Sequence, residues 1–245
     1  MRELNKECIM SSPTVSKEQR TAKKFLLIVV AASCLVAAMF GSRNSLSLTI
    51  EGIDQSQTLN YLQISFAFAL GQLVVGAISP FAGMIADKYG SGKTLTVGIL
   101  LGLLGIILIP YSTTAFTLSI SLGVISSIGL GVAGLPVVLA SVNRLIPQNK
   151  VGMAFGLVNA GQSLGQLILA PLAGFIIVNF GWILCILFLC TVLLLVLPFS
   201  FTLRSRTDTK QPSGVQTKSL SETLRIAFNT PSYIYLVVGF FVCGF

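Results

Sequence analysis

Residues 83–94 read GMIADKYGSGKT, and the interpretation of this short stretch decides between two very different fold predictions. Its last letters resemble the end of a phosphate-binding loop, G-x-x-x-x-G-K-[ST], whose first glycine opens a turn after a β-strand so that backbone N–H groups surround the phosphates. That first glycine position is Asp87 here, and a carboxylate repels a phosphate. The preceding run, Tyr61 to Ile85, is also too long and too rich in Gly and Ala for one buried strand. A nucleotide site is therefore not expected.

The composition is that of a membrane protein. Of the 245 residues, 53% are hydrophobic and 10% are charged, whereas a soluble domain carries roughly 25% charged residues. The mean hydropathy is +0.86. A helix that crosses a bilayer needs about 20 apolar residues, so the sequence predicts an all-α polytopic membrane protein embedded in a lipid bilayer. Its predicted spans are Phe25 to Leu48, Leu59 to Ala82, Leu95 to Tyr111, Phe116 to Val142, Met153 to Val178 and Trp182 to Leu203.

A seventh, shorter apolar run lies at the end of the chain. It begins at Tyr233 and reaches Phe245, about 20 Å of helix at about 1.5 Å per residue, which is less than a hydrocarbon core of about 30 Å. On this expectation the chain is either a truncated gene product or a half that needs a partner. The expected segments are a cytoplasmic N-terminal tail (1–24), a six-span transmembrane bundle (25–203), a cytoplasmic inter-bundle loop (204–232) and a truncated seventh span (233–245).

Basic residues alternate between the two sides of the predicted spans. All but one of the 16 Lys and Arg fall in the N-terminal tail or in the second, fourth and sixth connections. The positive-inside rule therefore places the N-terminus and these connections in the cytoplasm. The net charge of +8 is a topological signal, so no nucleic acid is expected as a partner. The chain has no histidine, and its five cysteines lack metal-ligand spacing, so neither a metal nor a cofactor is expected.

The opening stretch joins the second and third spans and carries a family resemblance. It follows the pattern G-x-x-A-D-[KR]-x-G-x-x-K, which resembles the signature loop of the major facilitator superfamily of transporters. In that family the aspartate pairs with basic groups across the cytoplasmic face and biases the outward-open state. Ser91 and Gly92 stand where the family usually has a basic residue, and Asp87 has a second, compatible role as a cap of the third span. The resemblance implies a conformational latch at Gly83, Asp87, Lys88, Gly90, Lys93 and Arg144.

A longer stretch narrows the resemblance. Residues 140–182 read ASVNRLIPQNKVGMAFGLVNAGQSLGQLILAPLAGFIIVNFGW, which is similar to the monocarboxylate and oxalate:formate transporter-like branch of that superfamily. Gly41, Arg43 and Asn44 resemble its bacterial members, so the implied location is a bacterial inner (plasma) membrane. The drug-antiporter pattern is absent from Gly161 to Pro171. The resemblance implies the N-terminal half of a fold with two six-helix bundles, and hence a second half-transporter or a homodimer as partner.

Arg43 is the one ionisable residue inside a predicted span, and a charge there is a candidate functional group. It lies roughly 27 Å along the helix from Phe25. Two roles are open: it faces a central cavity and binds substrate, or it extends to the outer interface as an anchor. The branch resemblance, in which a basic residue on the first span meets a carboxylate, favours the cavity. A guanidinium offers two parallel donors to a carboxylate, so Arg43 is predicted to bind a small organic anion.

Polar residues on the fifth and second spans are further candidates. Four residues of the fifth span, including Ser163, fall within about a 100° arc of one helix. This stripe faces either a cavity or another helix to which it is hydrogen-bonded. Five residues of the second span align in the same way, namely Tyr61, Ser65, Phe68, Gln72 and Ser79, and Tyr61 and Gln72 are candidates among them. The predicted substrate-binding set is Arg43, Asn44, Tyr61, Gln72, Asn159, Gln162 and Gln166.

Two functions remain open from the sequence. The first is a secondary active transporter that moves a small organic anion such as a monocarboxylate by symport, with a proton as the candidate coupling ion and with this half inactive alone. A carrier of uncharged or amphiphilic solutes is its variant. The second is a non-transporting membrane remnant or assembly partner. An enzyme is not expected, because no catalytic constellation is present. Glu51, Asp54 and Asp87 lie outside the spans, so the coupling group is expected in the second bundle.

Overall fold

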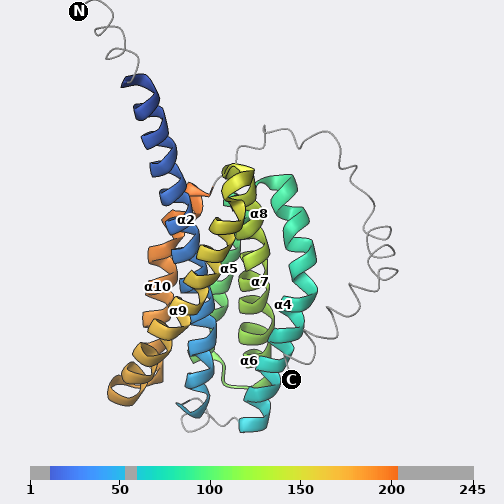
Figure 1. Cartoon of the computed structure of the whole chain (residues 1–245). Coiled ribbons are helices and arrows are strands. Elements are labelled where there is room, and N and C mark those ends of the chain that lie inside the picture. The colour runs from blue at the N-terminus through green and yellow to red at the C-terminus, as the bar shows by residue number, and fades with distance from the viewer. Residues whose placement is uncertain (1–11, 53–59, 204–245) are drawn as a thin grey trace, which may run out of the picture. The chain divides into compact units, whose positions relative to one another are not determined.

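The computed structural model describes residues 12–52 and 60–203, and within these ranges the chain forms helices and short connections with no β-strand (Figure 1). Six stretches are long and apolar enough to cross a membrane, which confirms the predicted all-α fold. Their bounds are Lys23–Gly52, Tyr61–Tyr89, Ser91–Tyr111, Ala115–Leu145, Gln148–Phe180 and Trp182–Thr202. The first helix begins at Ser12, inside the predicted N-terminal tail. The predicted inter-bundle loop and truncated seventh span lie outside the described residues.

Each membrane-crossing stretch is built from one or more helices. The first and second are α2 (Ser12–Leu46) with the 3-10 helix η1 (Ser47–Thr49), and α4 (Tyr61–Tyr89). The third is α5 (Ser91–Ile107) with η2 (Ile109–Tyr111). The fourth comprises α6 (Ala115–Leu118), the π-helix η3 (Ser119–Ser126), α7 (Ser127–Val132) and α8 (Leu135–Leu145). The fifth and sixth are η4 (Gln148–Lys150) with α9 (Val151–Phe180), and α10 (Trp182–Thr202).

The helices pack as two groups that meet along α5 and α10. In the first group α2 lies against both α9 and α10, and in the second group α4 and α5 lie against η3 and α7. Figure 1 shows α2, α9 and α10 together on one side of the bundle and α4 with α7 on the other. The space between α2 and α4 is therefore a boundary between two packed groups.

Residues 83–94 form a joint between two helices. Gly90 has φ 91°, a conformation that side chains other than glycine's rarely adopt, and it both ends α4 and precedes α5. Ser91 is buried, and its Oγ donates to the backbone oxygen of Leu203, 3.0 Å away at the end of α10. A charged side chain at position 91 would lose this contact and be buried, so this position favours a small hydroxyl side chain.

The fourth membrane-crossing stretch is interrupted. Its π-helix gives way to α7, which ends at Val132, and α8 starts again at Leu135 after Ala133 and Gly134. Pro136 has no N–H and so cannot continue a helical hydrogen-bond ladder from α7. The Gly134 N–H instead donates to the oxygen of Gly131, 3.2 Å away. The sequence predicted a single continuous span here, and the break is an addition to that prediction.

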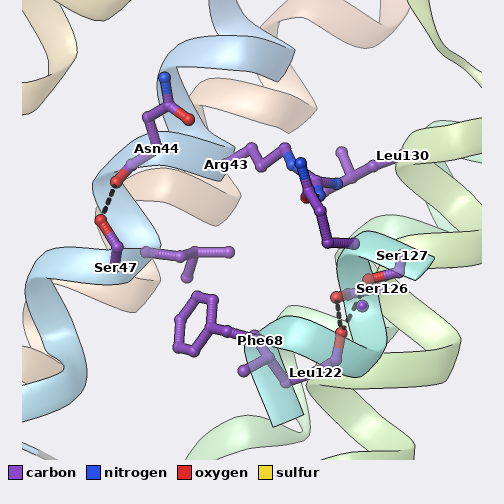
Figure 2. A pocket seen from close by; sticks show the side chains of 11 residues that line it. Arg43, Asn44, Ser47, Phe68, Leu122, Ser126, Ser127 and Leu130 are labelled. Carbon is purple, nitrogen blue, oxygen red and sulfur yellow. Dashed lines mark hydrogen bonds between the residues drawn. The ribbon is translucent and has the colours of Figure 1, made fainter. Parts of the chain in front are cut away.

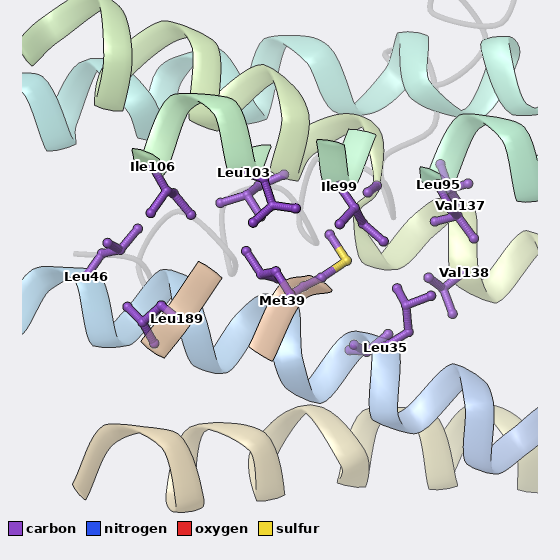
Figure 3. Packing of buried hydrophobic residues seen from close by; sticks show 14 of the residues in the cluster. Leu35, Met39, Leu46, Leu95, Ile99, Leu103, Ile106, Val137, Val138 and Leu189 are labelled. Atoms are coloured by element: carbon purple, nitrogen blue, oxygen red, sulfur yellow. The ribbon is translucent and has the colours of Figure 1, made fainter. Parts of the chain in front are cut away.

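The apolar core lies between α2, α5, α8 and α10. Figure 3 shows side chains of α2 facing a row on α5, with α8 and α10 closing the cluster. The row on α5 has helical spacing, so one face of that helix is buried along its whole length. The labelled members are Leu35, Met39, Leu46, Leu95, Ile99, Leu103, Ile106, Val137, Val138 and Leu189.

Candidate functional site

Arg43 reaches across the boundary between the two helix groups. It lies in the last turn of α2, and its Nη2 donates a hydrogen bond to Oε1 of Gln72 on α4. Figure 2 shows the Arg43 side chain extending from α2 into the cavity, while the amide of Asn44 points away from the guanidinium. Arg43 is half-buried and Gln72 is exposed, so their contact lies on an open part of the boundary between α2 and α4, and substrate binding by Arg43 stays a prediction.

Two lobes of a cavity flank this contact, and Arg43, Gln72 and Leu130 line both of them. The first, here called the Phe68 lobe, has a volume of about 140 Å³. The second, here called the Phe40 lobe, has a volume of about 160 Å³. The Phe68 lobe is also lined by Asn44, Leu46, Ser47, Gly71, Leu122, Ser126 and Ser127. The Phe40 lobe is also lined by Met39, Val75, Ser79, Gly131, Gly134, Leu135 and Pro136.

The serine hydroxyls of the two lobes are occupied by backbone oxygens. Ser47 Oγ donates to the oxygen of Asn44, and Ser79 Oγ donates to that of Val75, each at 2.7 Å. Ser126 and Ser127 both donate to the oxygen of Leu122, at 2.6 and 3.1 Å, because the π-helix brings that oxygen within reach of both (Figure 2). Among the described residues that line the lobes, the polar side chains free of such local bonds are therefore Arg43, Asn44 and Gln72.

The remaining predicted binding residues lie elsewhere. Tyr61 is exposed in the first turn of α4 and lines neither lobe. Asn159 is exposed and donates to the oxygen of Phe155 in its own helix, 2.9 Å away. Gln162 and Gln166 are half-buried and line neither lobe. The predicted stripe therefore forms a separate polar surface on α9, outside the cavity that holds Arg43.

The predicted latch residues gather at the opposite end of α4 from Tyr61. Arg144, in the last turn of α8, forms an ion pair with Asp87 in the last turn of α4. Lys88 lies over the ring of Tyr89, 5.4 Å from its centroid. Lys93 is exposed on α5, and Gly83 borders open space on α4. The structure thus joins α4 to α8 through Asp87 and Arg144, while Lys88 makes a separate contact.

Sequence reasoning missed three features of the site. It aligned Phe68 with Gln72 on the second span but did not anticipate the aromatic wall at Phe40, the π-helix, or the break between α7 and α8. A signal for the break was present, because GVAGLPVV at 131–138 combines two glycines with a proline inside an apolar run. The aromatic wall at Phe40 carried no comparable signal, since phenylalanine is common on every apolar helix face.

The described residues contain six stretches long and apolar enough to cross a membrane, and the first, second and fourth of these line the lobes beside Arg43. This is the architecture of a polytopic membrane protein. The sequence profile of the Major Facilitator Superfamily matches residues 29–245, and the chain belongs to this superfamily.

Individual relatives agree with this assignment. The chain is 28% identical over 160 residues to the riboflavin transporter RibZ of Clostridioides difficile, covering 65% of this chain and 34% of that protein. It is 25% identical over 178 residues to monocarboxylate transporter 11 of Mus musculus, covering 73% and 39%. Its fold matches the inward-open xylose transporter XylE from E. coli with a TM-score of 0.62 at 15% identity, covering 73% and 48%. The chain thus spans about a third to a half of the length of these proteins.

Proposed function

We propose that this chain provides the first six-helix bundle of a secondary active transporter that moves a small organic anion, such as a monocarboxylate, by alternating access. The observation that carries the proposal is the position of Arg43 between the two lobes, where it is the one charged side chain of their described lining. A guanidinium cannot lose its charge in a protein, and its parallel donors match a carboxylate. The similarity to a monocarboxylate transporter supports the same substrate class.

The walls of the lobes suit an anion with an apolar body. Phe68, Leu122 and Leu130 surround the first lobe, and Phe40, Val75 and Leu130 surround the second. We propose that the carboxylate binds at Arg43 and the apolar part of the substrate packs against these side chains. Asn44 would add a polar contact, and Gln72 would act through its hydrogen bond to Arg43. Tyr61, Asn159, Gln162 and Gln166 would contact substrate only when a second bundle faces them.

The ion pair between Asp87 and Arg144 is proposed to hold one of the alternating states. It connects the ends of α4 and α8, and these two helices also carry lining residues of the Phe40 lobe. Opening the bundle at this end would separate the two side chains. The same surface would carry positive charge from Lys88 and Lys93. Its helix ends would be set by Gly83 and Gly90.

A second bundle is proposed to complete the transporter, since the relatives are two to three times as long as their match to this chain. It would be supplied by a longer chain, a partner or a homodimer, and this bundle alone would be inactive. No carboxylate lines either described lobe, so a coupled proton would bind in the second bundle. Lys88, Lys93, Arg144 and Lys150 lie at helix ends in the second and fourth connections, which supports a cytoplasmic N-terminus. We propose that the membrane is a bacterial inner membrane.

A second candidate function is transport of an uncharged or amphiphilic solute. The similarity to a riboflavin transporter and the apolar walls of the lobes favour it. In that case Arg43 would contact a polar group of the solute and its charge would matter less.

Uptake into proteoliposomes tests these proposals. Labelled monocarboxylates, dicarboxylates and riboflavin would be offered to this chain alone and to this chain joined to the second bundle of a relative. We expect saturable uptake of a monocarboxylate by the joined form, and loss of that uptake in Arg43→Gln but not in the charge-matched control Lys24→Gln. Uptake of riboflavin that is insensitive to Arg43→Gln would contradict the anion proposal.

A further inference from the structure

The contact between Arg43 and Gln72 lies at the junction of the two lobes. Both residues line both lobes, and Leu130 is the third residue that the lobes share. Along α2, Phe40 lines the Phe40 lobe and Leu46 the Phe68 lobe. Along the antiparallel α4, Phe68 comes before Ser79 of the Phe40 lobe. The lobes are therefore stacked along the helix axes, with the Arg43 to Gln72 hydrogen bond between them.

The hydrogen bond from Arg43 to Gln72 gives the guanidinium an acceptor inside the helix bundle. A guanidinium within a membrane-crossing helix is costly unless an acceptor faces it. Among the described residues, Gln72 Oε1 is the side-chain acceptor that receives an Arg43 N–H, and the lobe serines are turned toward backbone oxygens. Gln72 thus supplies the missing acceptor without adding a charge.

We propose that Gln72 is a displaceable partner of Arg43: its Oε1 satisfies the guanidinium while the cavity is empty, and the carboxylate of the substrate takes its place. A carboxylate carries a full negative charge and two oxygens that match the parallel donors of the guanidinium, whereas the Gln72 amide offers one neutral oxygen, so the exchange favours a bound anion. Displacement of Gln72 also breaks its hydrogen bond to Arg43, which links α2 to α4 and lies between the two lobes. The two lobes would then become continuous. This inference rests on the proposed anion transport and assigns Gln72 a positioning role instead of a direct contact.

The two roles of Gln72 predict opposite effects of substitution. If Gln72 competes with the anion, Gln72→Leu removes the competitor, and affinity for the anion rises by about three- to tenfold. Gln72→Glu installs a charged competitor, and affinity falls by at least about tenfold. If Gln72 instead touches the anion directly, Gln72→Leu weakens binding.

The experiment measures binding of labelled L-lactate and benzoate to the 245-residue chain in nanodiscs, for wild type, Gln72→Leu, Gln72→Glu and the exposed amide control Gln148→Leu. Correct folding of each variant is checked by its thermal unfolding. Tighter binding by Gln72→Leu together with weaker binding by Gln72→Glu is the expected result. Weaker binding by Gln72→Leu, or no effect of Gln72→Glu, overturns the inference.

A second readout does not depend on anion transport. Phenylglyoxal modifies free guanidinium groups, and mass mapping of the peptides reports the rate at Arg43. We expect faster modification of Arg43 in Gln72→Leu and slower modification in Gln72→Glu, with Arg144 as the internal reference. If wild type binds neither anion, the anion proposal fails for these probes, and equal rates at Arg43 in all variants would refute the Gln72 assignment separately.

Discussion

The two faces of α2 differ in how they meet their neighbours. Toward α9 the backbones touch: a Cβ added at Gly165 would lie 2.2 Å from the oxygen of Ala37, and one at Gly41 would lie 2.7 Å from the oxygen of Gly165. Toward α4 the helices leave a cavity bridged by the side chains of Arg43 and Gln72. The contrast predicts that α2 and α9 stay packed together, and that any rearrangement within the bundle occurs at the boundary between α2 and α4.

The largest expected effect is on stability, at the face of α2 that packs against α9. Gly165→Leu places a side chain where the backbone of α2 already lies, so we expect a loss of about 1–3 kcal/mol or more in the free energy of unfolding. The matched control is Gly174→Leu on the same helix, because a Cβ there meets no atom within 4 Å. Denaturant titration in detergent micelles compares the two. Equal stability of both variants would contradict the close packing of α9 against α2.

At the face of α2 toward α4, Arg43→Gln is expected to lower affinity for a monocarboxylate by about 10- to 100-fold, since a hydrogen bond to a charged group contributes about 1.5–3 kcal/mol. Stability should change little, because the cavity already separates the helices. Arg43→Lys keeps the charge but loses the paired donors, so its affinity should lie between those of wild type and Arg43→Gln. Calorimetric titration gives all three values. A large loss of stability with unchanged affinity would assign Arg43 a structural role.

A smaller effect is expected at the ends of α4 and α8. Arg144 and Asp87 are 34% and 51% exposed, so their ion pair should contribute about 0.2–1 kcal/mol to stability. We expect Asp87→Asn to slow transport by the completed protein while leaving affinity for the anion within about twofold. A double-mutant cycle with Arg144→Gln measures the coupling. Additive effects of the two substitutions on transport rate would argue against a latch.

The smallest effect is expected on α9. Gln166 is half-buried and lines neither lobe, so Gln166→Leu should leave anion binding to this chain unchanged within about twofold. The same substitution in a form joined to a second bundle should reduce uptake if the α9 stripe completes the cavity. A reduction of binding in the chain alone would place Gln166 nearer to Arg43 than the structure does.

The fold was readable from the sequence where its signal is local. Apolar runs set the six membrane-crossing stretches, and Gly90 and Gly181 mark joints where positive φ is needed. The break near Gly134 was not predicted, because hydropathy averaged over about 20 residues hides an interruption whose flanks are equally apolar. The prediction placed Arg43 and Gln72 in one binding set, but their mutual contact depends on how α2 and α4 are packed, which no residue of either helix encodes by itself.

The most direct test of the account compares a carboxylate with its neutral amide. Dissociation constants for L-lactate and lactamide would be measured with the 245-residue chain in nanodiscs, for wild type and Arg43→Gln. The account predicts that wild type binds lactate at least about tenfold more tightly than lactamide, and that Arg43→Gln abolishes this preference. A preference that survives Arg43→Gln, or tighter binding of lactamide by wild type, would contradict an anion site at Arg43.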